Sequence, residues 1–398
     1  MEYKALQERI EKEQIRLKSG IRLAEYLRDM NEHGNGLLIC NLADSRDEYS
    51  LTGYLKEHYE TEISRGLDIL KDLAQATETK IYQGEGSAVL REPTALYRAI
   101  DEGVIRSNCA EQEYCASYMS EGYHNRPTLV VSAEDCRMIA DIEAGRRQKK
   151  TVMLCGQGPV FAEVECGTTV QELLSLFKVE KEWKAIVLGN QCGELLLPKE
   201  KDRTVEFSYL FDTVEPIYSD MCMVETMKRA AQMAMEDSCQ KCVICREGTW
   251  QAAHMLADAV ECKGKDTDLK ELEDIARIAG IGSMCQFGQR ALHPVYQAIK
   301  FFPDEFRSHI IDHKCLAGCC VGEQNFQIDP QLCTGCGSCV EACEYDAIDG
   351  KAKFIHMIDK KMCEKCGACV DACGEGAVKV GQGLKVPTRL TKVGRFRG

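Results

Sequence analysis

The stretch 333-CTGCGSCVEACEYDAID-349 is repeated thirty residues later as 363-CEKCGACVDACGEGAVK-379. Both copies carry four cysteines with the spacing C-x2-C-x2-C-x3-C. A loop with a cysteine at every third residue can wrap its thiolates around one corner of an iron–sulfur cube. Gly335, Gly337 and Gly367 permit the positive φ angles and the close backbone approach that such wrapping needs. The duplication therefore predicts two iron–sulfur sites in residues 313–380.

The ligands of these two sites follow from the way two-cluster ferredoxins use such runs, in which the last cysteine binds the other run's cluster. Neither site is then complete without the other copy, which explains the duplication. Glu344 and Gly374 follow the last cysteines in place of the usual proline, which loosens the turn but removes no ligand. Two zinc ribbons are the alternative, although zinc favours separated C-x2-C pairs. The expected [4Fe–4S] ligand sets are Cys333, Cys336, Cys339 and Cys373 for one cluster, and Cys343, Cys363, Cys366 and Cys369 for the other.

A third cysteine run occurs in the stretch 237-DSCQKCVICREGTW-250, where Cys239, Cys242 and Cys245 again follow C-x2-C-x2-C and lead into a helix. Amide groups at a helix N-terminus suit an anionic cluster. The fourth ligand has to come from elsewhere, and the glycine-rich loop 280-GIGSMCQFG-288 offers Cys285. We therefore expect a third [4Fe–4S] cluster on these four cysteines.

The stretch 309-HIIDHKCLAGCC-320 combines cysteines and histidines at high density. We expect a zinc ion here, with His309, Cys315 and Cys319 as ligands. The alternative is that His313 and Cys320 are simply buried at a domain junction. Elsewhere, buried cysteines act as small apolar side chains, and we expect this of Cys40, Cys109, Cys115, Cys136, Cys155, Cys166, Cys192, Cys222 and Cys262.

Composition excludes several classes of protein. The chain has 398 residues, 24 cysteines and a formal net charge of −13, which argues against general nucleic-acid binding. The sequence has no apolar run long enough to span a membrane and no secretory h-region at its start, so we expect a cytoplasmic protein with reduced thiols. The end of the chain is an exception, because residues 379–398 carry six basic residues and no acidic ones. They are expected to form either a solvated tail or an arm along an acidic partner.

Hydrophobic patterning predicts a multidomain α+β protein. An amphipathic helix is expected over residues 1–32, followed by alternating strands and helices. In the next module, Thr169 and Glu172 have the spacing of a helix capping box. The expected domains are an α/β region (1–148), a β-grasp-like module (149–203), a helical bundle that binds one [4Fe–4S] cluster (204–312), a ferredoxin-like domain with two [4Fe–4S] clusters (313–380) and the basic tail (381–398).

The stretches "SCQKCVICREGT", "GSMCQFG" and "FPDEFRSHI" resemble the cluster-binding domain of the flavin- and NADH-binding subunit of respiratory complex I. The equivalent subunits of NAD-linked bifurcating hydrogenases and formate dehydrogenases are similar, and they often append a two-cluster ferredoxin domain. The resemblance is strong from residue 220 onward and moderate over 151–200. Gln240 and Ile244 replace a glycine and a proline that are common in the family's loop.

Residues 1–148 depart from the family's flavin domain. The segment 37-LLICNLADSRDEYS-50 resembles the family's Cys-Asn-Ala-Asp-Glu-Ser-Glu-Pro-Gly segment, but Leu42 interrupts it and the Glu-Pro-Gly is missing. The glycine-rich loop that should precede it is absent, and 126-RPTLVVSAEDC-136 lacks the family's two asparagines. Phosphate cradling needs amides without obstructing side chains, so we expect a shrunken flavin domain that has lost FMN. A rewired loop that still holds FMN and NAD is the alternative.

Together these features predict an electron-relay subunit that carries three [4Fe–4S] clusters and performs no chemistry on a substrate. The expected partners are other subunits of a redox complex in an anaerobe, including a flavin-containing or substrate-reducing subunit and a small iron–sulfur subunit, with ferredoxin as a further candidate. No nucleic acid and no membrane span are expected. The alternatives are an active FMN-containing NAD(P)H dehydrogenase subunit and a zinc-bearing scaffold without redox function.

Overall fold

The computed structural model describes residues 3–43, 50–84, 86–107, 122–156, 158–189, 192–206, 211–261, 263–320, 326–359, 362–380 and 384–396. Cys109, Cys115 and Cys262, named above, lie outside these residues. The chain divides into two compact units. The first comprises Met1–Ser219, Thr226–Met255 and Lys270–Pro303, and the second comprises Asp220–Glu225, Leu256–Leu269 and Asp304–Gly398.

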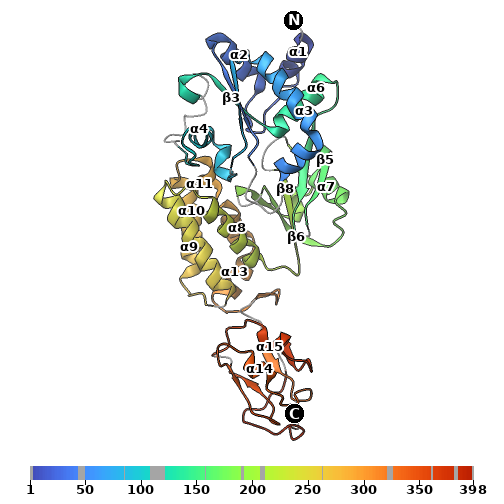
Figure 1. The fold of residues 1–398 in the computed structure, drawn as a ribbon, viewed down its shortest axis with the longest axis vertical. Helices are drawn as coiled ribbons and strands as arrows, with labels where there is room; N and C mark the ends of the chain where they lie inside the picture. The colour runs from blue at the N-terminus through green and yellow to red at the C-terminus, as the bar shows by residue number, and fades with distance from the viewer. Residues whose placement is uncertain are drawn as a thin grey trace. The chain divides into compact units, whose positions relative to one another are not determined.

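A three-stranded parallel sheet with the order β2-β1-β3 organises the start of the first unit (Figure 1). Leu38 and Cys40 of the central strand face a core that four helices cover, α1, α2, α3 and α6, whereas Leu37 and Ile39 face η1 and α4. Both faces of the sheet are therefore filled with apolar side chains. The bounds are β1 Leu37–Asn41, β2 Glu78–Tyr82, β3 Thr128–Ser132, α1 Lys4–Lys12, α2 Leu23–His33, α3 Leu51–Leu73, η1 Ala88–Arg91, α4 Pro93–Glu102, η2 Tyr123–Asn125 and α6 Ala133–Glu143.

The predicted single helix over residues 1–32 is wrong, because the chain turns between α1 and α2. Gln14 and Gly20 adopt positive φ angles of 50° and 87°, which end the first helix and form the turn. The Leu17 amide donates to the Ile21 carbonyl at 2.9 Å across this turn. Leu17 is nevertheless buried, so the apolar pattern reports burial but not helical continuity.

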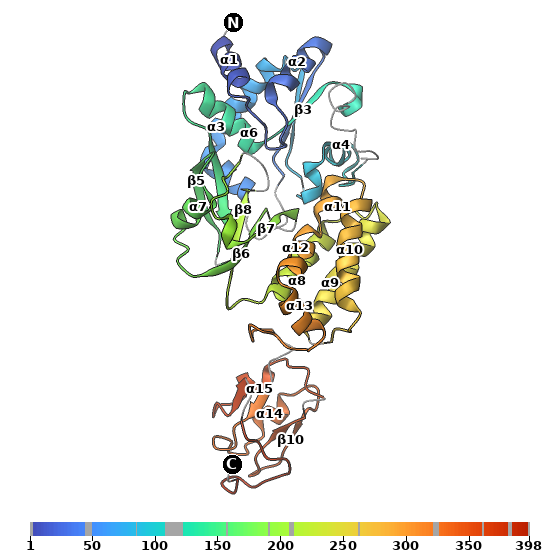
Figure 2. The same cartoon turned by 180° about the vertical axis from the view of Figure 1, so that it is seen from behind.

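The second sheet of the first unit has five strands in the order β5-β4-β8-β6-β7 (Figure 2). The predicted capping box at Thr169 and Glu172 is confirmed at the start of α7. The sequence analysis missed β8, which lies at the centre of the sheet, parallel to β4 and antiparallel to β6. The bounds are β4 Lys149–Leu154, β5 Val160–Glu165, α7 Val170–Leu176, β6 Trp183–Leu188, β7 Glu194–Leu196, η4 Pro198–Glu200 and β8 Thr213–Tyr218.

Buried charges join the two sheets. The Lys150 ammonium group, which is fully buried, lies 2.7 Å from Asp212, and Lys18 lies 2.8 Å from the other oxygen of the same carboxylate. Burial opposes ionisation of Asp212, but these two cations lower its pKa. Glu134 of α6 accepts a hydrogen bond from the Thr151 amide at 2.8 Å. The start of β8 is thereby fixed to β4 and α6.

Helices follow from residue 223 onward, and Figure 1 shows α8, α9 and α10 side by side. Pro303 begins a new helix, which divides the apolar stretch 291–310 into two. In the part of the chain that is described, no helix is both long and apolar enough to cross a bilayer. The bounds are α8 Met223–Asp237, α9 Val243–Val260, α10 Asp268–Gly282, α11 Gln286–Arg290, α12 His293–Phe301 and α13 Pro303–Ile310.

The duplicated segment folds as two interleaved halves in the second unit. The Asp329 amide donates to the Ala377 carbonyl at 2.8 Å, and the matching Asp359 amide donates to Ala347 at 2.8 Å. Each half therefore completes the other. The strands pair antiparallel, β9 with β12 and β10 with β11. The bounds are β9 Phe326–Ile328, α14 Ser338–Glu341, β10 Ile348–Asp349, β11 Met357–Ile358, α15 Ala368–Asp371 and β12 Val378–Val380.

The described part of the basic tail, residues 384–396, packs against this duplicated segment. The Ile355 amide donates to the Thr391 carbonyl at 2.9 Å, and the Val393 amide donates to Lys353 at 3.1 Å. Phe396 contacts the apolar cluster of the segment. This part of the tail is therefore attached to the segment through residues 391–396, while most of its side chains are exposed.

Candidate iron–sulfur and metal sites

The structure brings together the four cysteines predicted for the helical region, which we call the helical site. Cys245 lies in the first turn of α9, and Cys285 immediately precedes α11. Both belong to one buried apolar cluster, and Cys239 and Cys242 pack against it. The four thiols thus converge from two loops, one before each helix.

The surroundings of the helical site are apolar and crowded with sulfur. Burial raises the pKa of Cys245 to about 12 and that of Cys285 to about 11, and the neighbouring thiolates add to both shifts. The Gly288 amide donates to the Cys285 sulfur. A Cβ atom at Gly288 would lie 3.3 Å from the Cys245 sulfur and 2.6 Å from Ser283. Without positive charge, four thiolates in this space are unfavourable, and a bound iron–sulfur cluster would supply that charge.

The first ferredoxin site, as we call the set Cys333, Cys336, Cys339 and Cys373, combines three cysteines of the first copy with one of the second. Cys333, Cys339 and Cys373 belong to the apolar cluster of the duplicated segment, which also holds cysteines of the second copy. Burial raises the pKa of Cys339 to about 11, and the charges that add to this shift are those of Cys333, Cys373 and Cys336.

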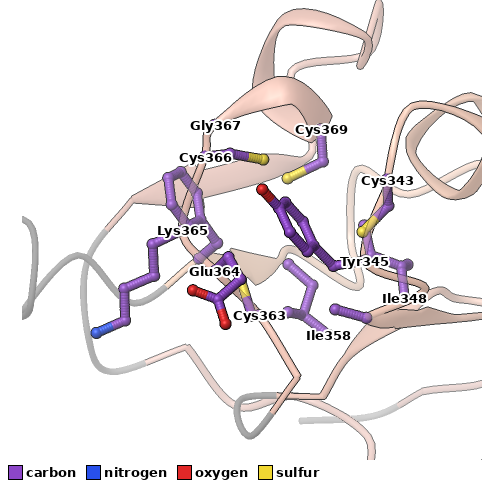
Figure 3. A pocket seen from close by; sticks show the side chains of 12 residues that line it. Cys343, Tyr345, Ile348, Ile358, Cys363, Glu364, Lys365, Cys366, Gly367 and Cys369 are labelled. Carbon is purple, nitrogen blue, oxygen red and sulfur yellow. The ribbon is translucent and has the colours of Figure 1, made fainter.

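The second ferredoxin site is the reciprocal set, Cys343, Cys363, Cys366 and Cys369. These four cysteines line one pocket together with the aromatic side chains of Phe326 and Tyr345. Figure 3 shows the thiols of Cys343, Cys366 and Cys369 arranged around the Tyr345 ring. Burial raises the pKa of Cys369, and the thiolates that contribute are Cys363, Cys366 and Cys343.

Glycines with positive φ angles allow these loops to wrap their cysteines around a common centre. Gly337 and Gly367 occupy matching positions with φ angles of 96° and 81°. Gly335 has φ 73°, and a Cβ atom there would lie 2.7 Å from the Phe354 carbonyl oxygen. A side chain at Gly335 is therefore excluded both by conformation and by contact.

A further group of ligands, which we call the Cys3His group, forms in the second unit from Cys222, His309, Cys315 and Cys320. All four residues are buried, and their ligand atoms lie within 4.8 Å of one another. The Cys222 sulfur lies 3.0 Å from Nε2 of His309, and the Cys320 sulfur lies 3.8 Å from the same atom. The other ring nitrogen, Nδ1, lies 3.4 Å from the Ala259 carbonyl oxygen and can donate a proton to it. That contact directs Nε2 at the thiols, as second-shell partners of metal-bound histidines do.

The electrostatics of the Cys3His group favour a thiolate. Hydrogen bonds from Cys320 and then His309 overcome burial and lower the pKa of Cys222 to about 4. Burial lowers the pKa of His309, but the Cys222 thiolate outweighs it and raises that pKa to about 9. The hydrogen bond to the Cys222 thiolate, followed by burial, raises the pKa of Cys320.

Two of the three residues predicted to bind zinc, His309 and Cys315, belong to the Cys3His group. The third, Cys319, is exposed and lies outside it. Sequence reasoning missed Cys222, because it precedes Cys320 by about a hundred residues and stands in no recognisable motif. Cys320, which the alternative interpretation treats as a buried junction residue, belongs to the group, and only the folded chain distinguishes it from its neighbour Cys319.

The distances between ligand atoms distinguish the Cys3His group from the three cysteine-run sites. A tetrahedral zinc site with Zn–S distances of about 2.3 Å holds its sulfurs roughly 4 Å apart. Within the described residues, only the Cys3His group gathers three or more Cys, His, Asp or Glu ligand atoms within 4.8 Å of one another. The twelve run cysteines are more widely spaced, which suits a cluster of several irons better than a single ion.

Matches to protein families and to known proteins agree with iron–sulfur binding by the cysteine runs. Residues 225–309 match the NADH-ubiquinone oxidoreductase-F iron–sulfur binding region, and residues 326–349 and 356–379 each match the 4Fe-4S binding domain. The chain therefore carries iron–sulfur domains of a type found in NADH-dehydrogenase-like oxidoreductases. The predicted resemblance to that family is confirmed.

Among curated relatives, the HndC subunit of the NADP-reducing hydrogenase of Solidesulfovibrio fructosivorans is 28% identical over 307 residues, which cover 70% of this chain and 61% of HndC. A subunit of the NADH-quinone oxidoreductase of Mycobacterium tuberculosis is 32% identical over 263 residues, covering 60% of this chain and 58% of the relative. The chain thus spans about three-fifths of the length of these relatives.

A solved structure, the NAD+-reducing [NiFe]-hydrogenase in the H2-reduced state, superposes with a TM-score of 0.66. The match covers 78% of this chain and 63% of the other at 19% sequence identity. This likeness concerns the fold, which is a mixed α/β multidomain architecture, and the family match adds the ferredoxin-type 4Fe-4S domain.

Proposed function

We propose that this chain is an electron-relay subunit of a multi-subunit oxidoreductase, with three [4Fe–4S] clusters and no flavin of its own. The helical site and the two ferredoxin sites would hold the clusters, and bound clusters would accept and pass single electrons. The observation that carries the proposal is the convergence of twelve cysteines into three sets of four, two of which exchange a ligand across the duplicated segment. The chain's own contribution is to bury the thiolates and to donate hydrogen bonds to sulfur.

Loss of flavin is supported by the contacts at the carboxyl ends of the parallel strands, where α/β proteins commonly bind cofactors. After β3, the Ser132 hydroxyl caps α6, and the Asp135 carboxylate accepts hydrogen bonds from the Ser132 and Lys18 amides. The first turn of α6 also carries Glu134, whose buried carboxylate lies 3.4 Å from the Lys18 ammonium group, so side chains of this chain already occupy the helix N-terminus that a phosphate would need. After β1, the side chain of Asn41 is bonded to the backbone of Leu90 and Ala43.

The finer domain identities also belong to this proposal. We assign residues 1–148 to a reduced flavin-domain remnant and the five-stranded sheet to a β-grasp module. The boundary of that module is extended from 203 to include β8 and therefore ends near residue 218. A compact remnant that retains both apolar faces of its sheet would still position the helical site, even without a nucleotide.

A partner subunit is supported by apolar side chains beside the helical site. Val243 and Ile281 are 60% and 73% exposed, and Ile244 and Met284 are also exposed. A Cβ atom at Gly282 would lie 2.6 Å from Ile244, so the ends of α10 and of the cysteine loop meet there. Exposed apolar groups of this kind mark interaction surfaces. We propose that another redox subunit covers them, with a flavin subunit, a small iron–sulfur subunit and ferredoxin as candidates, in the cytoplasm of an anaerobe.

We further propose that zinc occupies the Cys3His group, with Cys222, His309, Cys315 and Cys320 as its ligands. Three thiolates and one imidazole form a set that zinc commonly uses in closed structural sites. The ion would connect the start of α8 to the end of α13 and to the loop after it. Nδ1 of His309 would stay on the Ala259 carbonyl and would hold Nε2 toward the ion.

Anaerobic purification of the full chain with its native partners, followed by counting iron, zinc and flavin per chain, tests these proposals. We expect about twelve irons, one zinc and less than about one tenth of an FMN. About four irons or fewer would refute the relay. Stoichiometric FMN on this chain, with bleaching by NADH or NADPH, would instead establish the alternative, a flavin-containing NAD(P)H dehydrogenase subunit.

A further inference from the structure

The sulfurs of the first ferredoxin site receive polar side chains that the second site lacks. The Cys333 sulfur lies 3.7 Å from Nδ1 of His356, and the Cys336 sulfur lies 3.6 Å from the Ser338 hydroxyl. The Ser338 amide and the Thr334 hydroxyl also donate hydrogen bonds to the Cys336 sulfur. Because a cluster-bound cysteine is an acceptor only, the nitrogen and the hydroxyls are the donors in these contacts.

His356 is held in this position by its surroundings. Its side chain is buried, and its other nitrogen, Nε2, is buried without a hydrogen-bond partner. A Cβ atom at Gly350 would collide with the imidazole ring, so the backbone there leaves space for His356 alone. The contact between Nδ1 and Cys333 is therefore the polar interaction that the structure gives this ring.

The thirty-residue offset of the duplication identifies the matching positions in the second site. The offset holds in the backbone, since the Cys333 amide donates to Asp329 and the Cys363 amide donates to Asp359, both at 3.0 Å. Counting back from Asp329 places Phe326 where His356 stands, and Phe326 lines the second site. Ser338 and Thr334 correspond to Ala368 and Glu364. None of these three side chains carries a hydroxyl or an N–H group that could donate to a sulfur.

Two polar residues of the second site, Lys365 and Tyr345, do not replace the side-chain donors that the first site has. Figure 3 shows the Lys365 ammonium group pointing away from the cysteines. The Tyr345 ring lies among the thiols, but among the described residues its hydroxyl makes no hydrogen bond to a cysteine sulfur. The second site is therefore lined by the aromatic rings of Phe326 and Tyr345, whereas the first site is lined by hydrogen-bond donors to sulfur.

Hydrogen bonds to sulfur favour the reduced form of a cluster, which carries one more negative charge, and so raise its reduction potential. Burial in apolar surroundings disfavours that extra charge. The two ferredoxin sites have similar backbones and equal numbers of thiolates, so the difference in donors decides which site is reduced first.

We propose that His356, Ser338 and Thr334 give the first ferredoxin site a higher reduction potential than the second, so that an electron on this domain rests at the first site. The proposal rests on the cluster assignment made above. The step is a transfer of one electron, in which the second cluster is oxidised as the first is reduced, and no bond or proton changes. The two ferredoxin sites then differ in reduction potential, so that electron transfer from the second site to the first is favoured.

Anaerobic redox titration of the full chain, followed by electron paramagnetic resonance, measures the two potentials. Signals are assigned with Cys343→Ala, which removes a ligand of the second site, and Cys373→Ala, which removes one of the first. His356→Phe copies the residue of the second site, and Ser338→Ala copies Ala368. We expect each to lower the potential of the first site, by about tenfold in the one-electron reduction equilibrium, or about 59 mV, for His356→Phe and by less for Ser338→Ala.

The matched controls act on the second site or keep a donor. His356→Gln retains a side-chain N–H and is expected to keep at least half of the difference between the sites. Ala368→Ser adds a hydroxyl to the second site and is expected to raise its potential. Tyr345→Phe removes the hydroxyl of the second site and is expected to leave both potentials unchanged.

Several outcomes would overturn the inference. Equal potentials in the unaltered chain refute it, and so does an unchanged first site in His356→Phe with full iron content. A shift in Tyr345→Phe as large as that in His356→Phe also refutes it. If His356→Phe fails to assemble, the exposed Ser338→Ala decides the question alone. Iron well below eight atoms per chain in the unaltered protein, by contrast, refutes the cluster assignment itself.

Discussion

The cysteine-run sites and the Cys3His group differ in how the chain assembles them. In each run site three ligands come from one loop of seven residues, and a single cysteine arrives from elsewhere. The Cys3His group draws Cys222 from the start of α8 and His309 from α13, and brings their ligand atoms to 3.0 Å. A run can hold most of a cluster before the rest of the chain folds, whereas the Cys3His group exists only in the folded unit. Metal loss should therefore affect the two kinds of site differently.

The largest expected effect comes from breaking the exchange of ligands between the two ferredoxin sites. Cys373→Ala should lose about four irons, because one cubane cluster loses its fourth ligand. Adding Cys333→Ala should cost no more iron, since both residues serve the first site. Adding Cys363→Ala should raise the loss to about eight. Iron counting on anaerobic preparations measures all three.

The reverse result would contradict the crossed assignment. If Cys373→Ala combined with Cys363→Ala loses only about four irons, each copy holds its own cluster. The matching pair, Cys343→Ala with Cys369→Ala, should behave like Cys373→Ala with Cys333→Ala.

The next effect distinguishes the Cys3His group from its neighbour in sequence. Cys222→Ala should remove the zinc, about one ion per chain, because a three-ligand remnant in a closed site binds zinc poorly. Iron at the helical site should be retained. Cys319→Ala is the matched control, since that thiol is exposed and outside the group, and it should keep its zinc. Elemental analysis after dialysis against a chelator reports both metals.

Zinc loss in Cys319→Ala with retention in Cys222→Ala would reverse the ligand assignment in favour of the set expected from sequence. Loss of about four irons from Cys222→Ala, with no loss of zinc, would show that the Cys3His group holds a cluster rather than a zinc ion.

A smaller effect concerns the backbone of the first ferredoxin loop. Gly335→Ala places a Cβ atom 2.7 Å from the Phe354 carbonyl oxygen at a φ of 73°, and it should destabilise the loop by about 1–3 kcal/mol. Lys365 occupies the matching position with φ 57° and already carries a side chain there. Lys365→Ala should therefore change stability by less than about 0.5 kcal/mol. The urea concentration at which visible absorbance is lost compares the two, and equal effects would contradict the steric explanation.

Local patterns explain how much could be predicted. The spacing of the runs predicts all three cysteine sets, because three ligands of each set lie within seven consecutive residues. The capping box of α7 was readable for the same reason.

Tertiary placement explains the rest. β8 was missed because Pro216 and two acidic neighbours, Asp212 and Glu215, hide a strand whose position is decided by pairing with β4 and β6. The buried pair of Lys150 and Asp212 looks like surface charge in the sequence. Cys222 stands alone in the chain, and no spacing rule could connect it to His309. The break after α1 depends on Gln14 taking a positive φ angle, which its residue type does not favour.

The smallest effect concerns Gln240, a non-glycine residue with a positive φ angle in the loop of the helical site. Gln240 has φ 61°, as Lys365 of the second ferredoxin loop has φ 57°, whereas Gly337 and Gly367 take their positive φ angles without a side chain. A non-glycine residue in that region costs about 1 kcal/mol or more, and glycine costs about 0.5–1 kcal/mol in backbone entropy. The contacts of Gln240 with Ser238 and Arg246 both use its backbone and survive the change. Gln240→Gly should therefore stabilise the loop by about 0.5 kcal/mol and slow iron release to a chelator about twofold. Gln240→Ala keeps the strained angle and should give no gain, so an equal gain in both variants would mean that the side chain, and not φ, opposes the loop.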